Sequence, residues 1–140
     1  MMNATALIAE DEPVLAQALA SMLKRLWPEL TVLPAAQDGD EAVTKALEEQ
    51  PDILFLDIHM PSRDGLDAAE AIVDAWPETQ ALPLIVFVTA YDQYALAAFD
   101  RAAVDYVLKP VQTTRLAATC DRLQTQLKLR ATTPDDGPMV

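Results

Sequence analysis

The sequence predicts an α/β fold in which a doubly wound parallel sheet carries helices on both faces. Five short apolar runs alternate along the chain with longer stretches whose apolar residues recur at helical spacing. The runs are continuous rather than alternately apolar and polar, which is typical of strands covered on both faces. Five repeats of strand and helix imply right-handed crossovers and therefore a parallel sheet. With 140 residues, of which 51% are hydrophobic, the chain has the length of one compact domain.

The five apolar runs are the predicted strands, and four of them are rich in Ile, Leu and Val. They comprise residues 5–9, 31–35, 53–56, 84–88 and 105–108. Between them lie five apolar stripes at helical spacing, which we expect to pack on the sheet. The stripes are Leu15, Leu19, Met22 and Leu26; Val43, Ala46 and Leu47; Leu66, Ala69, Val73 and Trp76; Leu96, Phe99 and Ala103; and Leu116, Cys120, Leu123 and Leu127.

Proline positions agree with this division. Pro13 stands where the first helix begins, and the first turn of a helix tolerates proline because its N–H groups have no partner within the helix. Four further prolines stand in predicted connections, where no ladder or helix bond is lost: Pro28, Pro51, Pro77 and Pro83.

The composition excludes several classes of protein. Twenty-two acidic and ten basic residues give a net charge of −12, which repels phosphate backbones, so we expect this domain to make no direct nucleic-acid contact. The chain has no run of roughly 18 apolar residues and no signal-like start, so we expect no membrane span and a cytoplasmic location. One cysteine, Cys120, forms no internal disulfide and no cysteine zinc site. The glycine motifs of P-loop nucleotidases and dinucleotide oxidoreductases are absent.

Polar side chains follow the ends of the predicted strands. The set is Glu10, Asp11 and Glu12 after the first strand, Asp57 after the third, Thr89 after the fourth and Lys109 after the fifth. Open parallel sheets bind ligands at the carboxyl ends of the strands, near the point where the strand order reverses. If the first strand lies beside the third, Asp11 and Asp57 face each other at that point.

Carboxylates grouped without equal basic charge repel one another, and a divalent cation relieves that repulsion. Mg²⁺ fits best, because it prefers oxygen ligands and is commonly held by one or two carboxylates together with phosphate oxygens. Lys109 would then be a point charge for a phosphate, and Thr89 a neutral donor to it. A carboxylate in such a site is also able to attack phosphorus and form an aspartyl phosphate.

Four segments in this order resemble the receiver domain of two-component response regulators. They are Glu10 with Asp11, residues 56–65, Thr89 with Ala90, and Lys109 with Pro110. Residues 89–99 and 104–110 look most like the LytR/AlgR class, in which a receiver is joined to a LytTR DNA-binding domain. The resemblance covers roughly residues 5–130. It implies a flavodoxin-like (βα)5 fold whose five-stranded parallel sheet has the order 2-1-3-4-5.

The resemblance also implies a role for each matched residue. Asp57 would accept a phosphoryl group from a sensor histidine kinase. The side chains of Asp11 and Asp57 and the backbone carbonyl of His59 would bind Mg²⁺, with Glu10 contributing through water. Glu10 stands where the family usually has aspartate, which changes the reach of that carboxylate.

Three further residues match the family's switch. Lys109 would contact the phosphoryl group, Thr89 would move to hydrogen-bond it, and the ring of Tyr106 would turn inward in response. His59 and Tyr91 stand at positions that tune the dephosphorylation rate in the family. Taken singly, Thr89 is more simply a strand-end cap, Tyr106 a packing residue and His59 a solvated loop histidine.

The implied function is that of a signalling domain rather than a turnover enzyme. Phosphorylation would switch the surface formed by the fourth helix, fifth strand and fifth helix, favour a homodimer, and control transcription through a LytTR-type domain not present here. Residues 1–130 would form the receiver, and residues 131–140 a polar tail or the start of a linker after a helix that ends near Leu129 or Arg130. A complete single-domain regulator fits the same residues.

Two other interpretations compete with this one. The first is a Mg²⁺-dependent phosphatase with an aspartate nucleophile, although such enzymes characteristically carry a second Asp where this chain has His59, and they need a cap or pocket for substrate. The second is a degenerate receiver that serves only as a dimerisation module. The presence of Asp11, Asp57, Thr89 and Lys109 disfavours the second.

Overall fold

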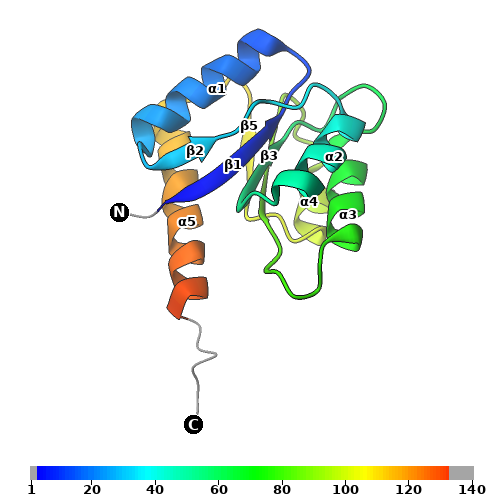
Figure 1. The fold of residues 1–140 in the computed structure, drawn as a ribbon. Coiled ribbons are helices and arrows are strands. Elements are labelled where there is room, and N and C mark those ends of the chain that lie inside the picture. Colours follow the sequence, from blue (N-terminus) through cyan, green and yellow to red (C-terminus); the bar gives the residue numbers. More distant parts are fainter. Residues whose placement is uncertain (1–2, 133–140) are drawn as a thin grey trace.

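The computed structural model describes residues 3–132 as five parallel strands that alternate with five helices (Figure 1). The strands are β1 (Ala4–Ala9), β2 (Leu30–Val32), β3 (Ile53–Leu56), β4 (Leu84–Thr89) and β5 (Asp105–Leu108). The helices are α1 (Pro13–Leu26), α2 (Gly39–Glu49), α3 (Gly65–Ala75), α4 (Ala95–Asp100) and α5 (Thr113–Thr132). The sheet order β2-β1-β3-β4-β5 confirms the predicted flavodoxin-like fold.

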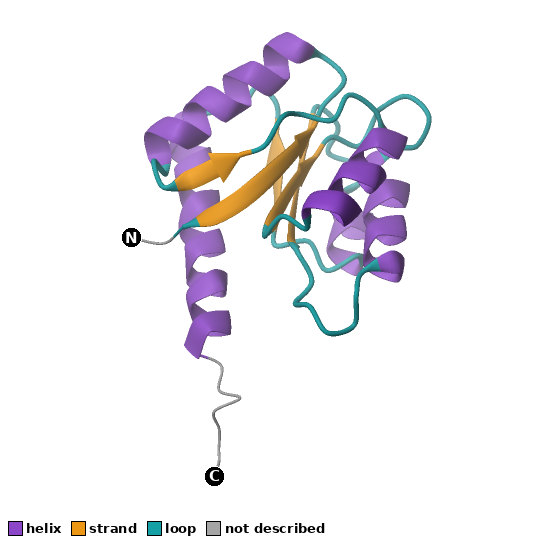
Figure 2. Ribbon diagram, in the orientation of Figure 1, coloured by secondary structure: helices purple, strands orange, loops and turns teal. Residues whose placement is uncertain are grey.

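Helices cover both faces of the sheet, with α1 and α5 on one face and α2, α3 and α4 on the other (Figure 2). Alternate residues of each strand enter the two cores: Ile8 and Phe55 pack toward α1 and α5, whereas Leu7 and Leu54 pack toward the opposite layer. Both faces therefore require apolar side chains, which explains why the strands appear in the sequence as continuous apolar runs.

The first and second strands each begin one residue earlier than predicted, and the second and fourth strands end at other residues than predicted. The second strand was expected over residues 31–35 but ends at Val32, after which Pro34 has no N–H to donate to the ladder. Beyond β2 the Leu33 N–H still donates to the Ala6 carbonyl, and an isolated bridge pairs Ala36 with Ala9. The fourth strand includes Thr89 as its last residue, so this hydroxyl belongs to the sheet itself.

The stripe predicted for the fourth helix was wrong. Leu96 and Phe99 are 82% and 51% exposed, and the buried residue of α4 is Ala98. The helix is only six residues long, and over so short a segment the apolar spacing does not determine which face is buried. Leu15 at the start of α1 is also partly exposed, whereas Leu19 of the same stripe is buried.

Helix α5 extends to Thr132, slightly beyond its predicted end near Leu129 or Arg130, and the sequence contains no glycine or proline after the helix starts until Pro134. The predicted tail or linker falls mainly on residues 133–140, which lie outside the described residues. Within residues 3–132, no helix is both long and apolar enough to cross a bilayer.

A buried carboxylate joins β5 to α5, and the sequence patterns did not identify it. Asp105 is 2% exposed and accepts hydrogen bonds from both terminal nitrogens of Arg115, at 2.9 and 2.7 Å, and from the hydroxyl of Thr119 at 2.7 Å. Arg122 lies 3.1 Å from the same carboxylate. Burial alone raises the pKa of Asp105, but the hydrogen bonds from Arg115, Thr119 and the Tyr106 N–H outweigh it and hold the pKa below its ordinary value.

We therefore expect Asp105 to make the fold acid-sensitive. Because its pKa is lower in the folded than in the unfolded chain, its contribution to stability is present at neutral pH and is lost as the pH falls through the folded pKa, below about pH 4. Urea unfolding from about pH 6 to about pH 3 should show that Asp105→Asn has a lower free energy of unfolding than the wild type, and that this difference shrinks in acid. Asp121→Asn, at an exposed position of α5, serves as control. A deficit independent of pH would contradict the account.

Candidate functional site

The carboxyl ends of four strands bring the predicted residues to one edge of the sheet. Glu10 follows β1 and is 5% exposed, and Asp57 follows β3 and is 7% exposed. Thr89 ends β4 and is fully buried, and Lys109 follows β5. Since β1 pairs with β3, β3 with β4 and β4 with β5, the four residues end neighbouring strands. The sequence prediction of a shared site at the strand ends is consistent with this topology.

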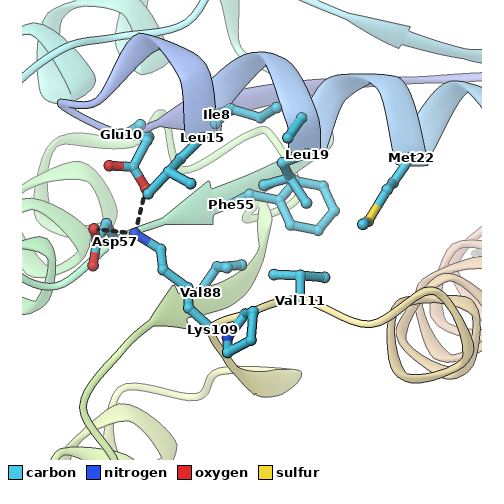
Figure 3. A pocket seen from close by; sticks show the side chains of 13 residues that line it. Ile8, Glu10, Leu15, Leu19, Met22, Phe55, Asp57, Val88, Lys109 and Val111 are labelled. Atoms are coloured by element: carbon cyan, nitrogen blue, oxygen red, sulfur yellow. Dashed lines mark hydrogen bonds and ion pairs between the residues drawn. The ribbon is translucent and has the colours of Figure 1, made fainter.

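Lys109 joins the two buried carboxylates. Its Nζ lies 2.5 Å from Glu10 Oε1 and 2.8 Å from Asp57 Oδ2 (Figure 3). The Lys109 N–H donates to the Thr89 carbonyl at 2.8 Å, and the Lys109–Pro110 peptide is cis. The other carboxylate oxygen of Asp57 accepts the Ile58 N–H at 2.7 Å. Both oxygens of Asp57 are therefore held in fixed directions.

The electrostatics of this group favour a charged lysine between its two acids. Burial raises the pKa of Glu10, and its hydrogen bond from Lys109 does not fully offset the effect. Burial opposes the charge of Lys109, yet its hydrogen bonds to Asp57 and Glu10 outweigh burial and raise its pKa. Two carboxylates facing one ammonium leave a local excess of negative charge, which a cation would balance.

The first acidic segment supplies further oxygen donors. Carboxylate oxygens of Glu10, Asp11 and Glu12 lie within 4.8 Å of one another, and the Glu12 N–H donates to Glu10 Oε2 at 3.1 Å. Asp11 and Glu12 are exposed, whereas Glu10 is buried. A set built only of oxygen ligands suits Mg²⁺ rather than a transition metal. The donor chemistry of this edge therefore fits the predicted ion.

Two glycines fix the loop that follows Asp57. A Cβ on Gly65 would lie 2.0 Å from the Asp57 carbonyl oxygen, and one on Gly39 would lie 1.9 Å from the Arg63 carbonyl oxygen. The Gly65 N–H donates to the Ile58 carbonyl at 2.7 Å, and the Gly39 N–H to the Pro61 carbonyl at 3.1 Å. Gly65 ends the segment 56–65 that carries part of the family resemblance. Gly39 was missed, because its partner is over twenty positions away in the sequence.

The two predicted switch residues are in different environments. The hydroxyl of Thr89 is buried and has no hydrogen-bond partner among the described residues. Tyr106 is half-buried, and its hydroxyl donates to the carbonyl of Tyr91 in the loop after β4. Burial raises the pKa of that phenol. A buried, unpaired hydroxyl is costly, so an acceptor brought near Thr89 would be bound readily.

His59 stands in the loop after β3 and is exposed, as predicted for a solvated histidine. Its ring nevertheless lies 4.2 Å from the ring of Tyr91 and 5.3 Å from that of Tyr94, measured between centroids. These contacts join the loop after β3 to the loop after β4. Tyr94 was not singled out from the sequence, where no pattern links it to His59.

Cys120 of α5, predicted as a small core residue, is buried in the core that α1 and α5 form with the sheet. Burial raises the pKa of its thiol to about 11. The thiol belongs to this apolar core and not to the group of polar residues at the strand ends.

Residues 6–121 match the family model described as response regulator receiver domain. An uncharacterized response regulatory protein of Vibrio cholerae is 42% identical over 97% of this chain and 51% of its own length. The sensory transduction protein LytT of Enterococcus faecalis is 35% identical over 86% of this chain and 48% of its own length. The chain thus spans about half the length of these curated relatives.

Solved structures agree with the sequence comparisons. The REC domain of AraT, a response regulator from Geobacillus stearothermophilus, superposes with a TM-score of 0.83 at 28% identity. The superposition covers 94% of this chain and all of that domain. The similarity therefore extends over nearly all of this chain.

Proposed function

This chain belongs to the family of response regulator receiver domains, and we propose that its phosphoacceptor is Asp57. A receiver is a signalling phosphoacceptor rather than a turnover enzyme, which decides against the phosphatase interpretation. One observation carries the assignment of Asp57: it directly follows β3, and its buried carboxylate accepts a hydrogen bond from Lys109, which also donates to Glu10. Acids at a surface position without such a partner would not be expected to be held in one orientation.

The proposed step is phosphoryl transfer from a phosphohistidine of a sensor kinase. An Asp57 oxygen attacks phosphorus, the P–N bond breaks, and its electron pair stays on the imidazole nitrogen of the kinase. Lys109 then exchanges its bond to Asp57 Oδ2 for bonds to phosphoryl oxygens, which carry more charge than the carboxylate it leaves. Burial of the site strengthens that attraction.

Receiver domains typically bind Mg²⁺, and we assign the ion in this chain to Asp11, Asp57 and the His59 carbonyl, with Glu10 acting through water. The ion would neutralise charge on the phosphoryl oxygens during transfer. The oxygen-only donor set at this edge supports the assignment. Glu10 is suited to an indirect role because each of its oxygens already accepts a hydrogen bond, one from Lys109 and one from the Glu12 N–H.

The proposed switch begins at Thr89. Its buried hydroxyl lacks a partner among the described residues, and a phosphoryl oxygen on Asp57 would supply one. Movement of Thr89 would open space for the ring of Tyr106, whose hydroxyl would then leave the Tyr91 carbonyl. Two packed arrangements of this kind give a two-state response rather than a gradual one.

The surface affected would be that of α4, β5 and α5, and we propose that it forms a homodimer on phosphorylation. Exposed apolar side chains support the proposal, since burying them on association is favourable. They are Leu96 and Phe99 on α4 and Leu108 on β5. The partner upstream is a cognate histidine kinase, as a receiver implies. Relatives bearing the name LytT support a LytTR-type DNA-binding output for the full protein.

The test is labelling by a small phosphodonor in the presence of Mg²⁺. We expect the wild type and Asp74→Asn, a control on the exposed face of α3, to gain one phosphoryl group, and Asp57→Asn to gain none. Peptide mass spectrometry locates the label. Chelation of Mg²⁺ should abolish labelling of the wild type. Equal labelling of wild type and Asp57→Asn would contradict the assignment, and no labelling of either would indicate a degenerate receiver.

A further inference from the structure

A cavity of about 210 Å³ lies between α1, the sheet and the loop after β5, directly beside Lys109 (Figure 3). Its wall is almost entirely apolar. The side chains that define it are Leu15, Leu19 and Met22 from α1, Phe55 and Val88 from the sheet, and Val111 from the loop. Glu10, Asp57 and Lys109 form its single polar end. None of the roles proposed above uses this apolar space.

We propose that this cavity binds a small, neutral, apolar ring compound. An engineered apolar cavity of roughly 150 Å³, lined by similar side chains, stays dry and binds benzene, so the space here holds a ring of one or two fused members. A water molecule would need two to four polar partners, which most of this wall does not offer. An apolar occupant is therefore favoured over water in the deeper part of the cavity.

The polar end determines the charge of the ligand. Two carboxylates and one ammonium carry a net negative charge, and two of the three N–H donors of Lys109 are already directed at Glu10 and Asp57. An anionic ligand would meet repulsion there, added to that of a chain with net charge −12. A ligand with one N–H or O–H would instead donate to Glu10, because a carboxylate accepts more hydrogen bonds than the two made here.

Ala18 offers a way to close the cavity without disturbing the core. It lines the cavity from α1 yet is itself exposed, so a leucine there covers or fills the space while remaining a good helix former. Gln17→Leu is the matched control: the residue is exposed on the same helix and lines a different groove on the side of β2. Both variants add a leucine to the surface of α1.

Indole is the probe, titrated into the full chain and followed by amide chemical shifts. We expect saturable shifts that map to α1 and the loop after β5, binding weakened about tenfold or more in Ala18→Leu, and unchanged binding in Gln17→Leu. Indole-3-acetate, the anionic analogue, should bind about tenfold more weakly than indole. Since binding is measured without phosphorylation, its result is independent of the proposed role of Asp57.

Three results would overturn the proposal. The first is the absence of saturable shifts in the wild type. The second is equal binding of indole by Ala18→Leu, which would locate the ligand elsewhere. The third is tighter binding of the anion. If a helical peptide from a partner protein shifts the same amides while indole does not, the cavity receives an apolar side chain instead of a free ligand.

Discussion

Replacement of Lys109 by methionine is expected to lower the free energy of unfolding by about 3 kcal/mol at neutral pH, because it leaves two buried carboxylates without their counter-ion. Glu10 and Asp57 side chains are 6% and 8% exposed, so water screens them poorly. Removal of one partner from a buried ion pair costs far more than the net value of the pair. Methionine keeps an unbranched apolar stem like that of lysine and lacks only its terminal atom, so packing changes little.

The pH dependence identifies the cause. Since burial already raises the pKa of Glu10, loss of Lys109 should raise it further, and protonation in mild acid then relieves the unpaired charge. Urea unfolding without metal should therefore show that the loss of unfolding free energy in Lys109→Met shrinks as the pH falls toward about 4. Adding Glu10→Gln to Lys109→Met should recover part of the loss. Lys24→Met, on the exposed face of α1, should cost less than about 0.5 kcal/mol. Equal deficits in the two lysine variants would contradict the prediction.

Replacement of Gly65 by alanine is expected to destabilise the protein by about 2 kcal/mol or more. The new Cβ would lie 2.0 Å from the carbonyl oxygen of Asp57 and 2.9 Å from its carbonyl carbon, and backbone atoms do not yield as side-chain ends do. The loop after β3 has to shift, and with it Asp57, the proposed phosphoacceptor. The expected sign is unusual, since glycine to alanine in a helix normally stabilises by roughly 0.5–1 kcal/mol.

Chemical unfolding shows directly whether Gly65→Ala lowers or raises the free energy of unfolding. Gly39→Ala should also destabilise, because its Cβ would lie 1.9 Å from the Arg63 carbonyl oxygen on the other side of the same loop. Ala75→Gly, at an exposed position near the end of α3, provides the ordinary helix cost of about 0.5–1 kcal/mol for comparison. A Gly65→Ala protein as stable as the wild type would mean that the loop accommodates the methyl group, which would contradict the close packing inferred there.

The strand ends were predictable from the sequence because their signal is local. Asp57 follows a four-residue apolar run directly, and Lys109 precedes a proline after another run, so each is placed by its own neighbours. The general rule on parallel sheets then brings them to one edge. The position of Thr89 at a strand end indicated a donor to phosphate, but the switch roles predicted for Thr89 and Tyr106 rest on the family resemblance alone, since a threonine or tyrosine near a strand end has no distinctive pattern.

Features that depend on contacts between distant segments were not predictable. The bonds of Asp105 to Arg115 and the fit of Gly39 against Arg63 depend on how α5 and α2 pack, which periodicity does not specify. The outward position of Leu96 was missed because a helical stripe predicts burial against something without naming it. The end of β2 was misjudged because the residues around Pro34 are apolar, although proline cannot continue the ladder.

The central claim is that the edge formed by Glu10, Asp57 and Lys109 receives a phosphoryl group, and a crystal structure with Mg²⁺ and beryllofluoride tests it most directly. We predict beryllium bonded to an Asp57 oxygen, Mg²⁺ ligated by Asp11, Asp57 and the His59 carbonyl, and Lys109 Nζ turned from Asp57 to a fluoride. Beryllofluoride bonded to another carboxylate, or absent while Lys109 keeps both of its present ion pairs at saturating Mg²⁺, would contradict the account.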